Sequence, residues 1–167
     1  MRYAYLDTEF TSLNRYTAKL ISLALLVPGG PEFYVELTDS WETADCSDFV
    51  CEIVLPQLDL ATHGRTTEQA RIELQAFLQR LGDVKIASDA PSWDWTLLLN
   101  LAGPAGLPAN VHAEPFDLNL LDLDDVDTPN EPPHHALLDA RLLAEMVSGS
   151  NAFLSFYTRI HHCQGRT

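Results

Sequence analysis

The pattern of apolar residues predicts an α/β fold built on a mixed sheet. Three apolar segments near the N-terminus follow one another with turn residues between them, and after residue 66 helical patterns alternate with further strands. The chain has 167 residues, of which 46% are hydrophobic and 20% charged. This length and composition suit one compact domain, residues 1–167, with a full core.

The first three strands are predicted at residues 3–6, 20–27 and 33–37. The first is a short apolar run that ends on an acidic cluster, and the second is closed by a Pro-Gly-Gly-Pro turn. In the third, apolar residues alternate with Tyr34 and Glu36, which is the period of two expected of a strand. The economical arrangement of the three is an antiparallel meander.

The rest of the chain predicts helices that alternate with two further strands. Ser47 or Asp48 is expected to cap a short helix that runs to residue 54. Thr66 opens a longer one whose apolar residues follow helical spacing until Gly82. The further segments are strands at 84–87 and 115–121, helices at 93–101, 136–147 and 152–161, and an exposed acidic loop at 122–133.

The net charge of −14 limits the classes of partner. Ten Lys and Arg against 24 Asp and Glu exclude a nucleic-acid binder that neutralises many phosphates with basic residues, but not one that binds through metal ions. No stretch approaches the roughly 18 apolar residues of a membrane span, and the N-terminus lacks the apolar part of a signal peptide. We therefore expect a cytoplasmic protein with no membrane partner.

Two carboxylates, Asp7 and Glu9, follow the first predicted strand. On an extended backbone, residues two apart point to the same side of the sheet, so these like charges repel unless a cation lies between them. Hard cations such as Mg²⁺ and Mn²⁺ prefer carboxylate oxygens. Solvated strand ends also carry this pattern by chance, so the pair alone is weak evidence for a metal site.

Two further aspartates have more than one interpretation. Asp94 falls at the start of a predicted helix, where the helix dipole also favours a carboxylate. Its neighbours Trp93 and Trp95 suit the core better than a base-stacking platform. Asp139 lies inside a predicted helix without a basic residue four positions earlier, so an ion pair within the helix is unsupported and a cation is favoured.

These residues resemble the motifs of the DEDDh group of 3′–5′ exonucleases. The segment 7–13, Asp-Thr-Glu-Phe-Thr-Ser-Leu, is similar to the group's first motif, Asp94 to its second, and the segment 134–140, His-His-Ala-Leu-Leu-Asp-Ala, to its third. The motifs occur in order over residues 1–147. The group includes ribonuclease T, oligoribonuclease and the proofreading exonucleases. Its small stand-alone bacterial exoribonucleases resemble the chain most, with a similar Met-Arg-Tyr start and a Val-Leu-Pro segment, here residues 54–56.

The chain departs from the group's pattern at three positions. Ser12 stands where glycine is usual, Trp93 where phenylalanine or tyrosine is usual, and Asp89 lies near a position often held by asparagine. None of these departures removes a metal ligand, so they bear on the shape of the nucleotide pocket.

The resemblance implies a ribonuclease-H-like fold, in which three antiparallel strands are followed by alternating helices and strands, with helices on both faces of the sheet. It also implies that Asp7, Glu9, Asp94 and Asp139 are catalytic and hold two divalent cations, Mg²⁺ or Mn²⁺. His134 would remove the proton of the attacking water. The implied substrate is the 3′ end of single-stranded RNA or DNA, with RNA slightly favoured, and a homodimer is a further expectation.

Helical spacing and the resemblance differ on the catalytic histidine. His135 and Asp139 are four residues apart and would share a helix face, whereas His134 and Asp139 would not. The resemblance selects His134, which is consistent if this residue precedes the helix. His135 is then expected to face solvent.

The resemblance also implies that Phe10, Leu13 and the backbone of Thr11 contact the terminal nucleotides. For Leu13, a plain core position is an equal alternative. Stacking would accept any base, so little sequence preference is expected. The basic residues that could contact phosphates, which the sequence does not rank, are Arg15, Lys19, Arg141 and Arg159.

The sequence is thus compatible with an exonuclease that releases nucleoside monophosphates, directed at RNA or, as a proofreading type, at DNA. A non-catalytic nucleotide-binding module that kept the fold is the alternative from another class. All four carboxylates and His134 are present, which favours the enzyme. A site that no longer catalyses a reaction would be free to lose a carboxylate that is unfavourable without a cation.

Overall fold

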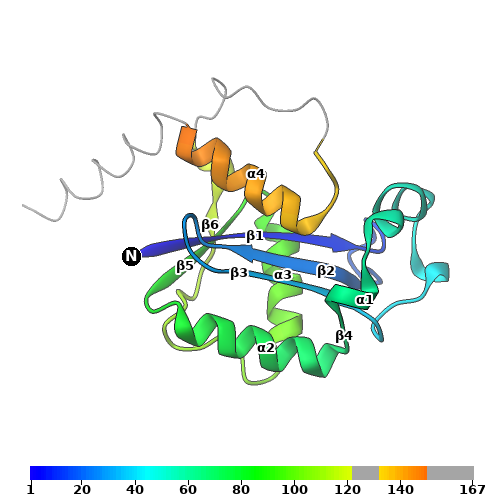
Figure 1. Cartoon of the computed structure of the whole chain (residues 1–167), viewed down its shortest axis with the longest axis horizontal. Coiled ribbons are helices and arrows are strands. Elements are labelled where there is room, and N and C mark those ends of the chain that lie inside the picture. The colour runs from blue at the N-terminus through cyan, green and yellow to red at the C-terminus, as the bar shows by residue number, and fades with distance from the viewer. Residues whose placement is uncertain (122–131, 150–167) are drawn as a thin grey trace, which may run out of the picture.

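The computed structural model of the protein describes residues 1–121 and 132–149, and within them it has a six-stranded mixed sheet between helices (Figure 1). The strands are β1 (Arg2–Phe10), β2 (Leu20–Leu26), β3 (Glu32–Leu37), β4 (Gly64–Arg65), β5 (Val84–Ser88) and β6 (Phe116–Asp117). The α-helices are α1 (Leu60–His63), α2 (Thr67–Arg80), α3 (Pro91–Ala102) and α4 (Ala136–Gly149). The predicted α/β class is therefore confirmed. No helix among the described residues is both long and apolar enough to cross a membrane.

The strand order places β1 in the middle of the sheet. The order is β4-β3-β2-β1-β5-β6, in which β2 is antiparallel to β1 and β3, and β1 is parallel to β5. The predicted meander of the first three strands is confirmed. Because β1 and β5 are parallel neighbours, their carboxyl ends meet at one edge of the sheet, where the acidic residues lie.

The two faces of β1 pack against different helices, because side chains alternate along a strand. Leu6 belongs to the core on the side of α2 and α3, whereas Tyr5 packs in the cluster that contains Ala140 of α4. Figure 1 shows α4 on one side of the sheet and α2 on the other. Asp7 and Glu9 continue the spacing of Tyr5, so both lie on the face that α4 covers.

β1 is longer than predicted, and the acidic pair lies inside it. We expected the strand to end at residue 6, but it continues to Phe10 because β2 pairs with it along this length. Asp7 lies opposite Ala24 and Glu9 opposite Ser22, and the register shifts only after Glu9. Sequence pattern could not show this, because the pairing partner is more than ten residues away.

Other predicted elements differ in length or type. The strand expected at 115–121 is limited to Phe116–Asp117 and is followed by a 3-10 turn at Leu118–Leu120, where the Asp117 carboxylate accepts a hydrogen bond from the backbone N of Asn119 (3.0 Å). The short helix expected to end at residue 54 is wound as a π-helix over Val50–Val54. The helix predicted at 152–161, and nearly all of the acidic loop at 122–133, lie outside the described residues.

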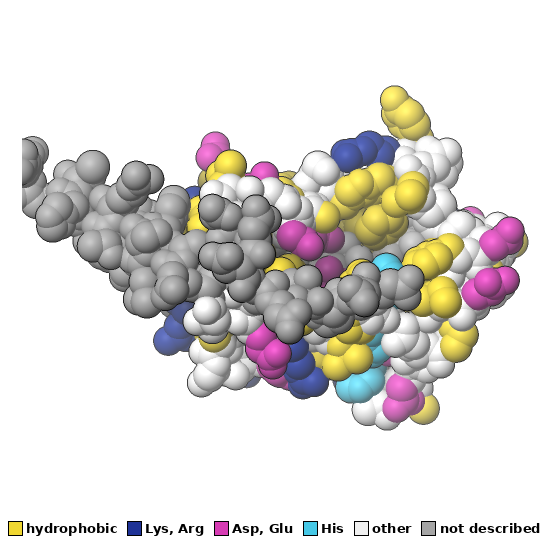
Figure 2. Space-filling view, turned by 90° about the horizontal axis from the view of Figure 1, so that it is seen from above, with side chains coloured by type: hydrophobic (Ala, Val, Ile, Leu, Met, Phe, Trp, Pro, Cys, Tyr) yellow, Lys and Arg dark blue, Asp and Glu magenta, His cyan; other side chains and the backbone are white. Residues whose placement is uncertain are grey.

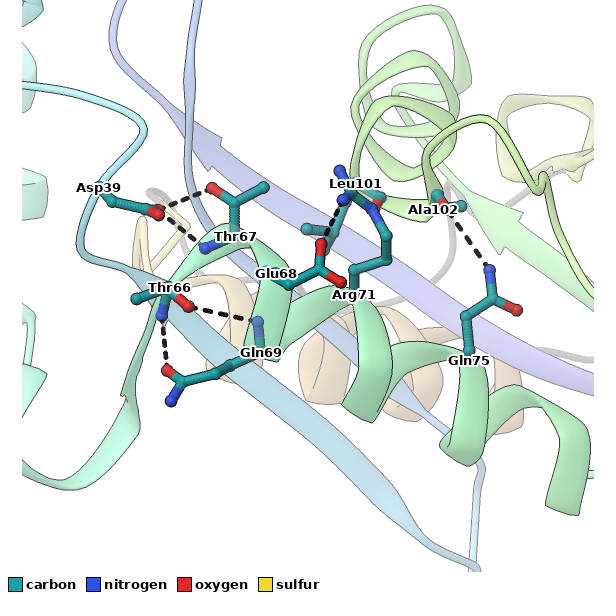
Figure 3. A network of polar contacts seen from close by, with 9 residues as sticks. All are labelled: Asp39, Thr66, Thr67, Glu68, Gln69, Arg71, Gln75, Leu101 and Ala102. Carbon is teal, nitrogen blue, oxygen red and sulfur yellow. Dashed lines mark hydrogen bonds and ion pairs between the residues drawn. The ribbon is translucent and has the colours of Figure 1, made fainter.

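α2 begins where the sequence predicts, with a complete capping box. The Thr66 hydroxyl accepts a hydrogen bond from the Gln69 backbone N (3.3 Å), and the Gln69 side chain accepts one from the Thr66 backbone N (3.0 Å) (Figure 3). Gly82, with φ at 68°, follows the helix end as expected of a helix-terminating glycine. The Arg71 side chain donates to the carbonyl of Leu101 (3.0 Å), which ties α2 to the last turn of α3.

The capping box predicts that the Thr66 side chain stabilises the fold. Thr66→Ala leaves the backbone N of Gln69 without its partner, so the free energy of unfolding should fall by about 1 kcal/mol in urea denaturation. Thr96→Ala, which removes an exposed hydroxyl within α3, is the matched control. Equal stability of the two variants would contradict the role assigned to the cap.

Candidate metal centre

A pocket of about 930 Å³ opens at the edge of the sheet where β1 and β5 end. Its charged and histidine lining comes from three separate parts of the chain. These residues are Asp7, Glu9, Asp89, Asp94, His134 and Asp139. Figure 2 shows acidic and histidine side chains among hydrophobic ones on this face of the molecule. The four carboxylates predicted from the sequence are thus brought into one site.

The carboxylates form two groups of three that share Asp7. Asp7, Glu9 and Asp139 each offer an oxygen, and these oxygens lie within 4.8 Å of one another. Asp7, Asp89 and Asp94 meet the same limit. Each group could hold a metal ion, since three carboxylate oxygens at such separations suit a hard cation.

Asp94 is 2% exposed, and hydroxyl groups from two strands hold it in place. Thr8 of β1 donates to one carboxylate oxygen (2.6 Å), and Ser88 of β5 donates to the other. The alternative interpretation, an aspartate that merely begins a helix, does not account for these donors. The contacts instead fix Asp94 between the ends of the two parallel strands.

One carboxylate oxygen of Asp139 accepts a hydrogen bond, and the other has no partner among the described residues. The backbone N of His135 donates to Oδ2 (2.7 Å), whereas Oδ1 is buried and has no hydrogen-bond partner among the described residues. The residue is only 7% exposed and lines the pocket. A buried carboxylate oxygen without a donor is costly, so a cation bound here would relieve that cost.

Burial and mutual repulsion disfavour the charged forms of these groups. The pKa of Glu9 is raised to about 8, mainly by desolvation and then by the carboxylates of Asp139 and Asp94. The pKa of Asp7 is well above its usual range, mainly because of burial and then because of Asp94. Desolvation also raises the pKa of Asp94, to about 6, although the hydrogen bonds from Ser88 and Thr8 lower it. Without a cation the cluster therefore retains protons.

His134 lines the pocket and precedes α4, in the non-helical position that the sequence analysis required of it. Its φ is 54°, in the left-handed region that a non-glycine residue rarely adopts. The Gln57 side chain donates to the carbonyls of Pro133 (3.0 Å) and His134 (3.1 Å), and the His134 ring meets Phe49 edge-on at 4.9 Å. These contacts hold the imidazole at the rim of the carboxylate cluster.

The expectation that His135 faces solvent is wrong. Its ring is half-buried and stacks on Tyr34 at 5.0 Å, with Nε2 3.4 Å from the tyrosine hydroxyl. The shared helix face predicted for His135 and Asp139 corresponds to a hydrogen bond from the His135 backbone rather than to an approach of its ring. The cause is tertiary: β3 supplies Tyr34 directly beneath the start of α4.

The three predicted substrate-binding residues are placed differently. Phe10 and Leu13 line the pocket, and Leu13 is 81% exposed, so the core alternative for Leu13 is wrong. Thr11 is fully buried, and its backbone N donates to Lys19 (3.0 Å) while its carbonyl accepts from Ser47 (2.9 Å). The structure therefore does not bring Thr11 to the pocket.

Asp89 is a candidate ligand that was not predicted from the sequence. It follows β5, whose end lies beside β1, and it is exposed at the pocket with Asp7 and Asp94. Its position directly after a strand was the available signal. Only the parallel pairing of β1 with β5 shows that this strand ends next to the acidic pair.

The raised pKa values predict an unusual pH dependence of stability. For metal-free protein, the thermal midpoint should fall as the pH rises from 4.5, the usual pKa of glutamate, to about 8, the pKa of Glu9. In this range the folded state holds a proton that the unfolded state has released, so rising pH favours unfolding.

Differential scanning calorimetry in a chelator measures this dependence. Glu9→Gln should make the pH dependence shallower, whereas Glu145→Gln, at an exposed position on α4, should leave it unchanged. A midpoint that rises over this pH range would be the opposite of what the cluster requires.

Comparison with protein-family models found no match to the chain, and comparison with curated proteins found none. The resemblance to DEDDh exonucleases is therefore supported by the three motifs alone, and the candidate metal site by the geometry described above.

Proposed function

We propose that this protein is a metal-dependent 3′–5′ exonuclease of the DEDDh type, which hydrolyses single-stranded nucleic acid from its 3′ end and releases nucleoside monophosphates. One observation carries the proposal: carboxylates from three distant motifs meet in one pocket. A buried oxygen of Asp139, which has no donor among the described residues, adds to it. RNA is the preferred polymer in this proposal, because the chain resembles the small stand-alone exoribonucleases of the group.

The arrangement of the sheet supports a ribonuclease-H-like fold. Three antiparallel strands are followed by strands that alternate with helices, and helices lie on both faces. This is the order that the resemblance implies. It puts the first acidic pair on the central strand, where α3 and α4 can bring the later motifs to it.

Charge balance supports binding of two cations. Asp7, Glu9, Asp94 and Asp139 together carry four negative charges when ionised, which would repel a phosphate. Two divalent ions, Mg²⁺ or Mn²⁺, would neutralise them, stabilise the charge of a phosphodiester in hydrolysis and lower the pKa of a bound water. Asp7 belongs to both groups of oxygens, so its carboxylate would help to hold both ions.

In this proposal, other residues orient the carboxylates, accept a proton and contact the terminal bases. Thr8 and Ser88 orient the carboxylate of Asp94, and the backbone of His135 orients that of Asp139. His134, at the pocket rim, accepts the proton of the attacking water, a role suited to an imidazole. Phe10 and Leu13 offer apolar surface to the terminal bases.

A gel assay with 5′-labelled single-stranded RNA and DNA tests the proposed activity. With Mg²⁺ or Mn²⁺ we expect a ladder of products shortened from the 3′ end, and a chelator should abolish it. Asp139→Asn should also abolish it, because that substitution removes a cation ligand. Glu145→Gln, an exposed change on the same helix, serves as the control.

The same gel separates the alternatives. A ladder with DNA alone would favour a proofreading type of exonuclease. No ladder with either polymer would overturn the enzyme and leave the non-catalytic nucleotide-binding module.

The two histidines provide a second test. His134→Ala should lower kcat by about 10²- to 10⁴-fold, because it removes the proposed general base. His135→Ala should retain most of the activity, since the backbone N that holds Asp139 remains. Single-turnover rates of the two variants measure the difference, and the reverse ranking would exchange their roles.

A further inference from the structure

The loop between β1 and β2, residues 11–19, borders the pocket, because Ser12 and Leu13 line it. We propose that this loop binds the single strand where it leaves the metal centre, with Arg15 contacting a phosphate and Tyr16 offering its ring to a base. The inference depends on the proposed function for its ligand, but it concerns residues outside the carboxylate cluster.

The loop lies in a segment whose charge is opposite to that of the whole chain. Residues 10–31 contain no Asp or Glu, although the chain has 24 of them, and they contain Arg15 and Lys19. The carboxylate cluster lies immediately beside this segment. An anionic strand that enters the site thus meets basic and no acidic side chains along this loop.

The structure ranks three of the four basic residues that the sequence left unranked, and the fourth, Arg159, lies outside the described residues. Lys19 pairs with Asp45 at 2.7 Å, and Arg141 pairs with Glu32 at 2.6 Å. Arg15 donates only to neutral acceptors among the described residues, the carbonyl (3.3 Å) and the hydroxyl (3.1 Å) of Ser92. Of these three residues, Arg15 therefore keeps a charge that no described carboxylate neutralises.

Aromatic stacking connects Arg15 to the pocket. Its guanidinium lies 4.5 Å from the centre of the Trp93 ring, and Phe10 stacks on Trp93 at 4.7 Å. Phe10 follows Glu9 in the chain and lines the pocket, while Trp93 precedes Asp94. The guanidinium is thus held next to the segments that carry two of the carboxylates, while the residue itself stays exposed.

Tyr16 is 98% exposed, so its ring makes almost no contact within the described structure. The exposure belongs to an ordered turn. The Asn14 carbonyl accepts hydrogen bonds from the backbone N of Thr17 (3.1 Å) and Ala18 (2.8 Å), and the Asn14 side chain accepts one from the backbone N of Tyr16 (3.1 Å). An exposed aromatic ring beside an unopposed cation is the combination that binds single strands through stacking and phosphate contact.

Binding of a 5′-fluorescein RNA of about ten nucleotides, a length within the range of single-strand sites, tests the loop by fluorescence anisotropy. The full chain is used with Ca²⁺ in place of Mg²⁺, to load the site without turnover. Arg15→Gln and Tyr16→Ala should each raise Kd about tenfold. Arg15→Gln should also reduce the slope of log Kd against log salt concentration by about one, the value for one lost phosphate contact.

Lys19→Gln is the matched control. It removes a positive charge from the same loop, but Asp45 already pairs with that charge. We expect its Kd to stay within about twofold of wild type. Thermal midpoints of all three variants check that each is folded. Wild-type Kd values in both Arg15→Gln and Tyr16→Ala, an equal loss in Lys19→Gln, or no binding by the wild type would overturn the inference.

The two proposals can fail separately. If the wild type binds RNA through Arg15 and Tyr16 but gives no ladder, the loop inference stands and the exonuclease does not. If the ladder forms but both loop variants bind as the wild type does, the exonuclease stands and the loop inference is wrong.

Discussion

The structure depends on one electrostatic constraint, the burial of several carboxylates beside one another at the edge of the sheet. Desolvation and mutual repulsion raise the pKa values of Asp7, Glu9, Asp94 and Asp139. Such a cluster is stable only if protons or cations compensate its charge. The hydrogen bonds around it orient the oxygens but do not neutralise them, which leaves room for a divalent ion.

The fold satisfies this constraint by bringing the acids from different layers. β1 presents Asp7 and Glu9 on the face covered by α4, and α4 adds Asp139 from above that face. Thr8 points to the opposite face and donates a hydrogen bond to Asp94, which lies in the first turn of α3. The alternation of side chains along a single central strand therefore serves both halves of the cluster.

The loop at residues 11–19, which borders the acidic centre, carries basic but no acidic residues. The strongly negative net charge argues against a long electrostatic track for nucleic acid, and the described structure offers instead a short loop with Arg15 and Tyr16. Phe10, which precedes this loop, and Leu13, which belongs to it, add apolar surface to the pocket that the carboxylates line. Under the proposed function, such a surface would bind only a few terminal nucleotides.

The sequence by itself determined the α/β class, the meander, the cap of α2 and the four candidate ligands, because each depends on local periodicity or on a motif. Tertiary structure decided the length of β1, the membership of Asp89 in the cluster and the burial of His135. These depend on pairing with β2, on the parallel register of β1 with β5 and on Tyr34 of β3, all distant in sequence. Local pattern reports which residues can share a face, whereas only long-range packing decides what that face meets.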